Sequence, residues 1–221
     1  MPTRAGLFTP AKVQSLYHRH IVTTSPGHEL SYRTIWTLRI HRVPPPYSVA
    51  MAAPANPPMR IGHGYDLHRL EPVAPQGAGR PFILAGLRFD HPTGPVGHSD
   101  GDAVYHAVTD AILGALGESD IGQLFSDADP RNEGADSKTF VEDAASRMRE
   151  AGYAIGNLDV TVICERPKIA PVKPKMIANI AGLLGCSVGQ VNLKGKTHEA
   201  VDAVGEGRAV EVHAVVLLEK T

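Results

Sequence analysis

Residues 97–116 have the sequence GHSDGDAVYHAVTDAILGAL, in which apolar residues recur at helical spacing. This periodicity is typical of an amphipathic helix whose apolar face packs on a core. We therefore predict a helix from Ser99 to Leu116, with Ser99 or Asp100 as its N-cap. The side chains expected on its buried face are those of Val104, Val108, Ala111, Ile112 and Ala115.

Strands and helices are predicted on both sides of this helix from the same kind of periodicity. The predicted strands cover residues 60–68, 157–165, 190–196 and 209–219, and residues 82–89 form a predicted hairpin. Two more helices are expected, one at 136–151 capped by Asp136 or Ser137 and one at 173–184 ended by Gly185. The order β, ββ, α, α, β, α, β, β predicts an α+β fold, an α/β sandwich whose mixed sheet is covered on one side by helices.

The last predicted strand, residues 209–219, is unusually apolar toward its end. This composition fits a central strand of a monomer. It equally fits a strand whose second face packs against another subunit.

The chain has 221 residues, and its first 58 differ in composition from the rest. They contain nine of the 18 prolines, six Lys or Arg and one acidic residue. We expect residues 1–58 to be a disordered or non-native extension, either an organellar transit peptide or the product of a misassigned start at Met51 or Met59. Residues 59–221 are expected to form one folded domain.

The charge and the cysteine content exclude several classes of protein. Residues 59–221 carry 16 Lys or Arg and 22 Asp or Glu, and this acidic balance argues against nucleic acid as a partner. Cys164 and Cys186 are too few for a disulfide framework and fit a reducing compartment. No apolar run reaches the length of a membrane span.

Asp66, His68 and His106 are residue types that bind a divalent metal. Asp66 and His68 are two apart, so they point to the same side of a strand. Asp110 lies four residues after His106 on the same helix face and could accept the second ring N–H of that histidine. The spacing alone also fits a surface pair and a hydrogen-bonded core histidine, because no HExxH or CxxC motif is present.

Three further polar segments are candidates for binding a phosphorylated ligand: residues 120–130, 165–171 and 194–199. The last combines lysines, a threonine and a glutamate, which suits a polyphosphate and its magnesium. Each segment also fits a solvated loop. The sequence contains neither a P-loop nor a GxGxxG fingerprint.

The chain resembles the 2-C-methyl-D-erythritol 2,4-cyclodiphosphate synthase family in ordered motifs from Arg60 nearly to the C-terminus. They are RIGHGYDLHRL (60–70), GHSDGDAVYHAVTDAILGALGESDIGQLF (97–125), DADP (127–130), GADS (134–137), GNLDVTVICERPKIAP (156–171) and VNLKGKTHEAVDAVGEGR (191–208). The resemblance implies a homotrimer with active sites between subunits. It also implies an enzyme that converts 4-diphosphocytidyl-2-C-methyl-D-erythritol 2-phosphate to the cyclic diphosphate and releases CMP.

The resemblance also implies roles for individual residues. Zinc would be held by Asp66, His68 and His106, and magnesium or manganese by Glu199. His98 and Thr197 would stabilise the transition state, and Ser99 would lie beside the 2-phosphate. The erythritol and ribose would be lined by Asp120, Ile121, Gly122, Phe125, Asp127 and Asp129. The cytidine and its phosphate would contact Cys164, Pro167, Lys168, Ile169, Ala170 and Lys196.

The chain departs from the family pattern near its end, where the arginine of a common Gly-Arg-Gly-Glu-Gly motif is replaced by Glu206 and stands two positions later as Arg208. A phosphate role for Glu206 is therefore not carried over. Two other functions stay open: a zinc-dependent phosphoester hydrolase and a non-catalytic nucleotide-binding trimer. A bacterial cytoplasm and a plastid both fit as the compartment.

Overall fold

The computed structural model describes residues 56–126, 129 and 132–221, so most of the expected N-terminal extension lies outside the described residues. The main sheet has five strands in the order β4-β1-β7-β5-β6. These are β1 (Met59–Pro72), β4 (Thr93–Pro95), β5 (Tyr153–Ile163), β6 (Val191–Lys196) and β7 (Ala209–Lys220). Strands β5 and β6 are parallel and the other pairs antiparallel, so the predicted mixed sheet is confirmed.

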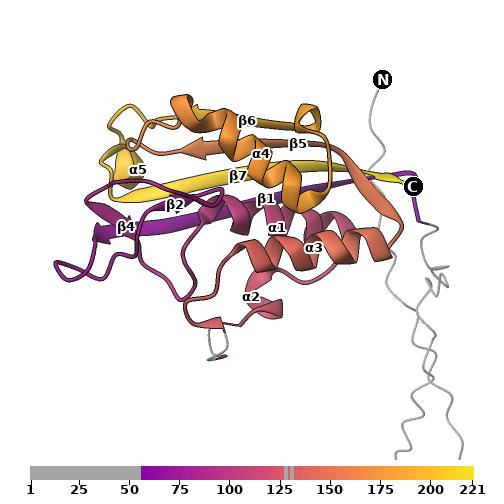
Figure 1. Cartoon of the computed structure of the whole chain (residues 1–221), viewed down its shortest axis with the longest axis horizontal. Coiled ribbons are helices and arrows are strands. Elements are labelled where there is room, and N and C mark those ends of the chain that lie inside the picture. The colour runs from indigo at the N-terminus through magenta and orange to yellow at the C-terminus, as the bar shows by residue number, and fades with distance from the viewer. Residues whose placement is uncertain (1–55, 127–128, 130–131) are drawn as a thin grey trace, which may run out of the picture. The chain divides into compact units, whose positions relative to one another are not determined.

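Three longer helices, α1 (Ala103–Leu116), α3 (Lys138–Glu150) and α4 (Lys173–Leu184), lie together along one side of the sheet (Figure 1). The short elements are the α-helices α2 (Ile121–Leu124) and α5 (Asp202–Gly205) and the 3₁₀ helices η2 (Ala170–Val172) and η3 (Val188–Gln190). Strands β2 (Ile83–Leu84) and β3 (Leu87–Arg88) form the predicted hairpin. The predicted α+β architecture is confirmed. None of the described helices has the length and apolarity needed to cross a membrane.

The start of helix α1 was predicted four residues too early. Asp102, not Ser99 or Asp100, is its N-cap, and one Asp102 carboxylate oxygen accepts the backbone N–H groups of Val104 and Tyr105. The same carboxylate also accepts the N–H groups of Ala85 and Gly86 from the β2–β3 turn. A single buried side chain therefore joins the hairpin to the helix.

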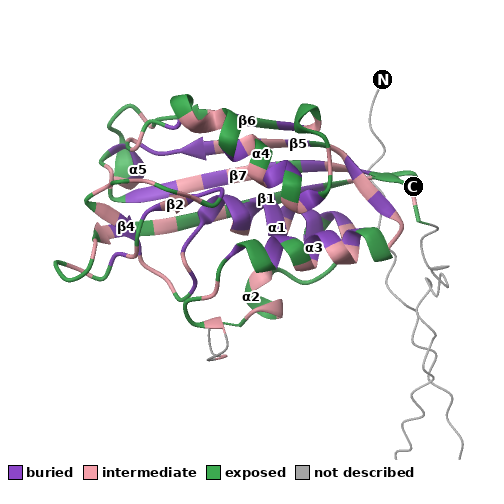
Figure 2. Cartoon of the chain, viewed as in Figure 1, coloured by how far each residue is buried: buried purple, intermediate pink, exposed green. Residues whose placement is uncertain are grey.

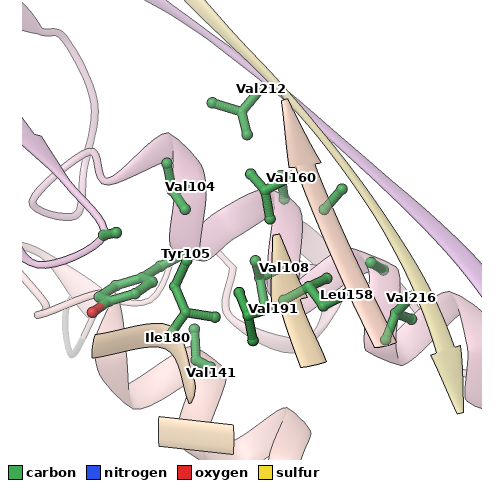
Figure 3. Packing of buried hydrophobic residues seen from close by; sticks show 14 of the residues in the cluster. Val104, Tyr105, Val108, Val141, Leu158, Val160, Ile180, Val191, Val212 and Val216 are labelled. Carbon is green, nitrogen blue, oxygen red and sulfur yellow. The ribbon is translucent and has the colours of Figure 1, made fainter. Parts of the chain in front are cut away.

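The core lies between the sheet and the helices. Figure 3 shows Val104 and Val108 of α1, Leu158 and Val160 of β5 and Val212 of β7 among the side chains packed there. All the side chains predicted for the buried face of α1 are buried. The two cysteines are free thiols, as expected for a chain without a disulfide framework.

The opposite face of the sheet carries apolar side chains without a covering layer among the described residues. Exposed and buried residues alternate along β1 and β7 (Figure 2). Ile61 is 73% exposed, Tyr65 is 48% exposed and Val215 is 45% exposed. One face of these two strands therefore faces the helices, and the other presents apolar surface.

Two glycines of β1 set the distance between this strand and α1. A Cβ built on Gly62 would stand 1.8 Å from the Ala111 carbonyl oxygen, and one on Gly64 would stand 1.8 Å from the Ala107 carbonyl oxygen. Only glycine permits the helix backbone to come this close to the strand. This close packing brings His106 of α1 next to the side chains that follow Gly64 on β1.

Candidate metal centre and active site

Asp66, His68 and His106 converge at one point. The carboxylate atom Asp66 Oδ2 lies 2.9 Å from His68 Nδ1 and 3.0 Å from His106 Nδ1. One potential ligand atom from each of the three residues lies within 4.8 Å of the other two. The prediction that these residues come together is confirmed: β1 supplies two of them from one face and α1 supplies the third.

The chemistry of this cluster fits a divalent metal. His68 Nδ1 is buried and has no hydrogen-bond partner among the described residues, although Asp66 Oδ2 is close. A buried ring nitrogen without a hydrogen bond costs about 1–3 kcal/mol, and a metal ion bound to it would remove this cost. Two imidazoles and a carboxylate with one open position form a ligand set that metal ions occupy in catalytic sites.

The electrostatics of the cluster favour a cation. Burial by itself would raise the pKa of Asp66, but the neighbouring His106 and His68 lower this pKa to about 2. Burial opposes the charge of His106, whereas the hydrogen bond and the charge of Asp66, followed by Asp102 and Asp100, raise its pKa. The carboxylate thus keeps its negative charge far into the acid range.

The second ring nitrogen of His106 contacts two hydroxyl groups. His106 Nε2 lies 2.8 Å from Ser137 Oγ and 3.1 Å from Ser99 Oγ. The predicted hydrogen bond from His106 to Asp110 is wrong, because Asp110 instead accepts the backbone N–H of Ile121 at 2.8 Å. The spacing of four placed Asp110 on the right side of α1, but the imidazole turns toward the start of α3.

The loop after α1 carries several of the predicted substrate residues and packs close to the metal cluster. The Phe125 ring lies 4.6 Å from the Phe140 ring, centroid to centroid, and Phe140 lies 6.0 Å from His106. Asp120 caps α2 by accepting the backbone N–H of Gln123. The structure places Ile121 and Gly122 in α2 and Asp129 just beyond it, whereas Asp127 lies outside the described residues.

An arginine that sequence reasoning missed supports the loop of His98 and Ser99. Arg80 donates from Nε to the Gly97 carbonyl oxygen at 2.7 Å and from Nη2 to the His98 carbonyl oxygen at 3.0 Å. His98 is exposed, whereas Ser99 is buried. Nothing in the sequence indicated this contact, because Arg80 lies in a loop without a periodic pattern and its partners lie in another loop seventeen and eighteen residues later.

The remaining predicted residues lie at the same end of the sheet but on other strands. In the strand register, His68 pairs with Val210, Ile163 pairs with Glu211, and Ile163 also pairs with Lys196. Strands β7 and β5 separate β1 from β6, so three strand spacings of about 4.8 Å, roughly 14 Å in all, lie between the two groups within one chain. One chain therefore does not bring the 164–170 and 196–199 segments onto its own metal cluster.

Within these two segments the predicted residues differ in exposure. Cys164 and Ile169 are buried, and the backbone N–H of Cys164 donates to the Lys196 carbonyl oxygen at 3.1 Å. The exposed side chains are those of Lys168, Ala170, Lys196, Thr197 and Glu199, and Pro167 is half-buried. Thr197 Oγ1 donates to Glu199 Oε1 at 3.0 Å.

The turn after Thr197 has a strained backbone. Glu199, Ala200 and Asp202 have positive φ angles of 52°, 60° and 63°. Such angles are unfavourable for residues with a Cβ and cluster at functional sites. Further on, Glu206 and Arg208 pair with each other at 2.5 Å between Oε2 and Nη2.

Comparisons with known proteins identify the family of this chain. The family model described as "YgbB family" matches residues 59–219. The rice protein "2-C-methyl-D-erythritol 2,4-cyclodiphosphate synthase, chloroplastic" is 46% identical over 225 residues, covering 99% of this chain and 99% of the rice protein. The Proteus mirabilis protein of the same name, without the word chloroplastic, is 49% identical and covers 73% of this chain and 98% of its own length.

A solved structure, "IspF (Plasmodium falciparum) CDP complex", is similar with a TM-score of 0.64 at 37% identity. The structural match covers 74% of this chain and 97% of the Plasmodium falciparum chain. The chain therefore belongs to the YgbB family.

Proposed function

We propose that this chain is a 2-C-methyl-D-erythritol 2,4-cyclodiphosphate synthase of the non-mevalonate route to isoprenoid precursors, a phosphorus–oxygen lyase. The 2-phosphate of 4-diphosphocytidyl-2-C-methyl-D-erythritol 2-phosphate attacks the β-phosphorus, the bond to the α-phosphate oxygen breaks, and CMP leaves. The observation that carries this proposal is the convergence of Asp66, His68 and His106 in a chain whose relatives bear that enzyme's name.

We assign zinc to the Asp66–His68–His106 cluster, one ion per subunit. The mixed nitrogen and oxygen ligand set and the open fourth position support this choice. Zinc bound there would supply Lewis-acid polarisation of a β-phosphate oxygen. The chain's own part is to hold the ligands in place and to keep the site negative through the low pKa of Asp66.

We assign a second divalent cation, magnesium or manganese, to Glu199. An exposed carboxylate in a strained turn can bind such a cation together with substrate phosphates. A cation there would neutralise the charge of the α- and β-phosphates. His98 and Thr197 then orient the phosphates and stabilise the transition state, where positioning and charge neutralisation carry most of the rate.

The remaining parts of the substrate are assigned to residues at the two ends of the site. We assign Ser99 to the 2-phosphate, and the position of its hydroxyl next to His106 supports this assignment. The polyol end contacts Asp120, Ile121, Gly122, Phe125, Asp127 and Asp129. The cytidine end contacts Cys164, Pro167, Lys168, Ile169, Ala170 and Lys196, in keeping with the CDP named for the Plasmodium falciparum structure.

The working form is proposed to be a homotrimer, with each active site shared by two subunits. Two observations support the assembly. The outer face of β1 and β7 exposes Ile61, Tyr65 and Val215. The metal cluster and the Lys196–Glu199 segment lie on strands separated by two others, so a neighbouring subunit is needed to join them.

Residues 1–58 are proposed to be a plastid transit peptide ahead of the catalytic domain at residues 59–221. Their basic, proline-rich composition supports this, and so does the alignment of nearly the whole chain with a rice protein named chloroplastic. N-terminal sequencing of the mature protein tests the proposal. A mature protein that begins at Met1 would contradict it, and so would translation that starts at Met51 or Met59. A precursor that begins at Met1 and a mature protein that begins near residue 59 are expected.

The reaction is tested with purified protein, zinc, magnesium and the diphosphocytidyl substrate, with mass spectrometry of both products. We expect CMP and the cyclic diphosphate, and we expect His68→Ala to abolish both. His91→Ala is the matched control, because His91 lies outside the site and bonds within its own loop to Thr93. CMP with an uncyclised diphosphate would instead indicate a hydrolase, and binding of CDP without turnover would indicate a non-catalytic module.

A further inference from the structure

We propose that Ser137 and Asp100 are positioning residues of the metal site, which act together to keep the proton of His106 on Nε2 and the lone pair of Nδ1 directed at the metal. The inference rests on the proposed metal-dependent function. It assigns to the start of α3 and to the loop before α1 a task that Asp110 was predicted to perform.

The direction of each hydrogen bond follows from the chemistry of the three groups. Ser137 Oγ makes a short contact with Asp100 Oδ1, and the Ser137 backbone N–H donates to Asp100 Oδ2 at 3.2 Å. A carboxylate only accepts hydrogen bonds, so the Ser137 hydroxyl proton points to Asp100. The Ser137 oxygen is then left as an acceptor toward His106 Nε2 at 2.8 Å, which requires the proton to be on Nε2.

The tautomer set in this way is the one that a metal needs. In a neutral imidazole with the proton on Nε2, Nδ1 carries the free lone pair. His106 Nδ1 is the atom that faces Asp66 Oδ2 at 3.0 Å, so a metal bound there would replace the proton that the metal-free ring donates to this carboxylate. The group that accepts a hydrogen bond from the other ring nitrogen of a metal-binding histidine typically fixes the orientation of the ring. Such a group contributes ten- to a hundredfold in metal affinity.

Ser137 is fully buried and is not used to cap its own helix. It occupies the N-cap position of α3, yet its side chain makes no capping hydrogen bond. A serine at this position normally accepts an N–H of the first helical turn and stabilises the helix by about 1 kcal/mol. Here the hydroxyl is directed to Asp100 and His106 instead, so a structural role in α3 does not account for it.

Ser99 does not replace Ser137 in this arrangement. The Ser99 hydroxyl is further from His106 Nε2, at 3.1 Å, and it accepts the backbone N–H of Gly101 at 3.2 Å. Ser137 alone has both the shorter contact to the ring and a carboxylate behind its hydroxyl. Ser99 is thus available to the substrate while Ser137 holds the ring.

The test is a titration of the full-length, metal-free chain with zinc alone, in competition with a chromogenic chelator. Ser137→Ala is expected to weaken zinc binding roughly ten- to a hundredfold. Asp100→Asn is the second variant. Its amide can donate to Ser137 and turn the hydroxyl proton toward Nε2, which favours the tautomer that cannot bind through Nδ1. Ser146→Ala is the matched control, since Ser146 lies on the same helix and bonds only to Glu150 among the described residues.

A second readout is the ¹⁵N–¹H long-range correlation spectrum of the imidazole groups. In the zinc-loaded wild-type protein, His106 is expected to show a protonated Nε2 whose proton is protected from exchange with solvent, and zinc-loaded Ser137→Ala is expected to lose that protection. Zinc affinity within twofold of wild type in both variants, with unchanged protection of the Nε2 proton, overturns the inference. Because no substrate is present, that result leaves the proposed reaction intact, and an inactive wild type would leave the inference intact.

Discussion

Gly64 of β1 lies against Ala107 of α1 so closely that a Cβ on Gly64 would stand 1.8 Å from the Ala107 carbonyl oxygen. This contact places the next residue pair, Asp66 and His106, within hydrogen-bond distance. Gly64→Ala is expected to destabilise the fold by about 3 kcal/mol or more, because backbone on both sides must move apart. Denaturant unfolding measures the loss, and zinc affinity should fall with it.

The matched control for this change is Gly182→Ala in helix α4. Nothing lies within 4 Å of a Cβ at Gly182, and the residue is exposed within the helix. Alanine there is expected to stabilise the fold by about 0.5–1 kcal/mol. If both substitutions changed the free energy of unfolding equally, the close approach of α1 to β1 would not require glycine at position 64.

Asp102→Ala tests the buried carboxylate that joins the β2–β3 turn to α1. Its loss leaves four backbone N–H groups without their acceptor, two in the turn and two in the first turn of the helix. We expect a loss of about 2–5 kcal/mol in the free energy of unfolding. Asp136→Ala, which removes an exposed hydrogen bond and an exposed ion pair to Lys138, should cost less than about 1 kcal/mol. Equal effects would contradict this role of Asp102.

Asp110→Ala tests whether Asp110 supports the loop around α2 or the ring of His106. Asp110 holds the backbone N–H of Ile121, not the ring of His106, so zinc affinity is expected to stay within about twofold of wild type. The KM for the substrate should rise, because α2 and the residues beside Phe125 lose their anchor to α1. Chelator competition and steady-state kinetics measure the two effects, and a tenfold loss of zinc affinity would show that Asp110 does support His106.

The pH dependence of stability follows from the ion pair between Asp66 and His106. The pKa of His106 is raised in the metal-free fold, because Asp66 outweighs the effect of burial. The contribution of His106 to the free energy of unfolding is therefore present below its unfolded-state pKa of about 6.5. It is lost as the pH rises through the folded-state pKa of His106. The pKa of Asp66 is lowered to about 2, so its contribution is present above about 3.8 and is lost as the pH falls toward 2.

Zinc reverses the upper part of this profile, because it needs His106 without a proton on Nδ1. As the pH rises above the unfolded pKa of about 6.5, the melting temperature of the chelator-treated protein is expected to fall relative to that of His106→Gln. The increase in melting temperature produced by zinc should become larger over the same pH range. Differential scanning calorimetry with and without zinc measures both, and a zinc increment that does not change with pH would contradict the assignment.

Periodicity predicted the long elements well, because their apolar faces are buried. Helix α4 has the predicted bounds, and the buried stripe of α1 is as predicted. The short elements α2, β4 and α5 were missed, since three or four residues show no period. The start of α1 was misplaced because three acceptors, Ser99, Asp100 and Asp102, are close together, and the hairpin that selects Asp102 is distant in sequence.

The three residues of the candidate metal cluster were predicted from their residue types, but the side chains that support them were not. Asp110 has the right spacing on the helix, yet the rotamer of His106 directs Nε2 to Ser137, thirty-one residues away. The contact of Arg80 with the His98 loop likewise depends on tertiary packing. Ser137 was visible in the sequence only as a candidate cap, and its unused capping position becomes informative once its surroundings are known.

The strand order puts the Asp66 cluster and the Glu199 turn on opposite sides of β7 and β5 within one chain. If neighbouring copies complete each site, two inactive variants can complement each other. Mixed assemblies of Asp66→Ala and Glu199→Ala chains would contain some junctions where both contributing halves are intact, roughly a quarter of them in an equal mixture. A single gene product would then behave genetically as two separable functions, and a damaged allele could be rescued by a differently damaged one.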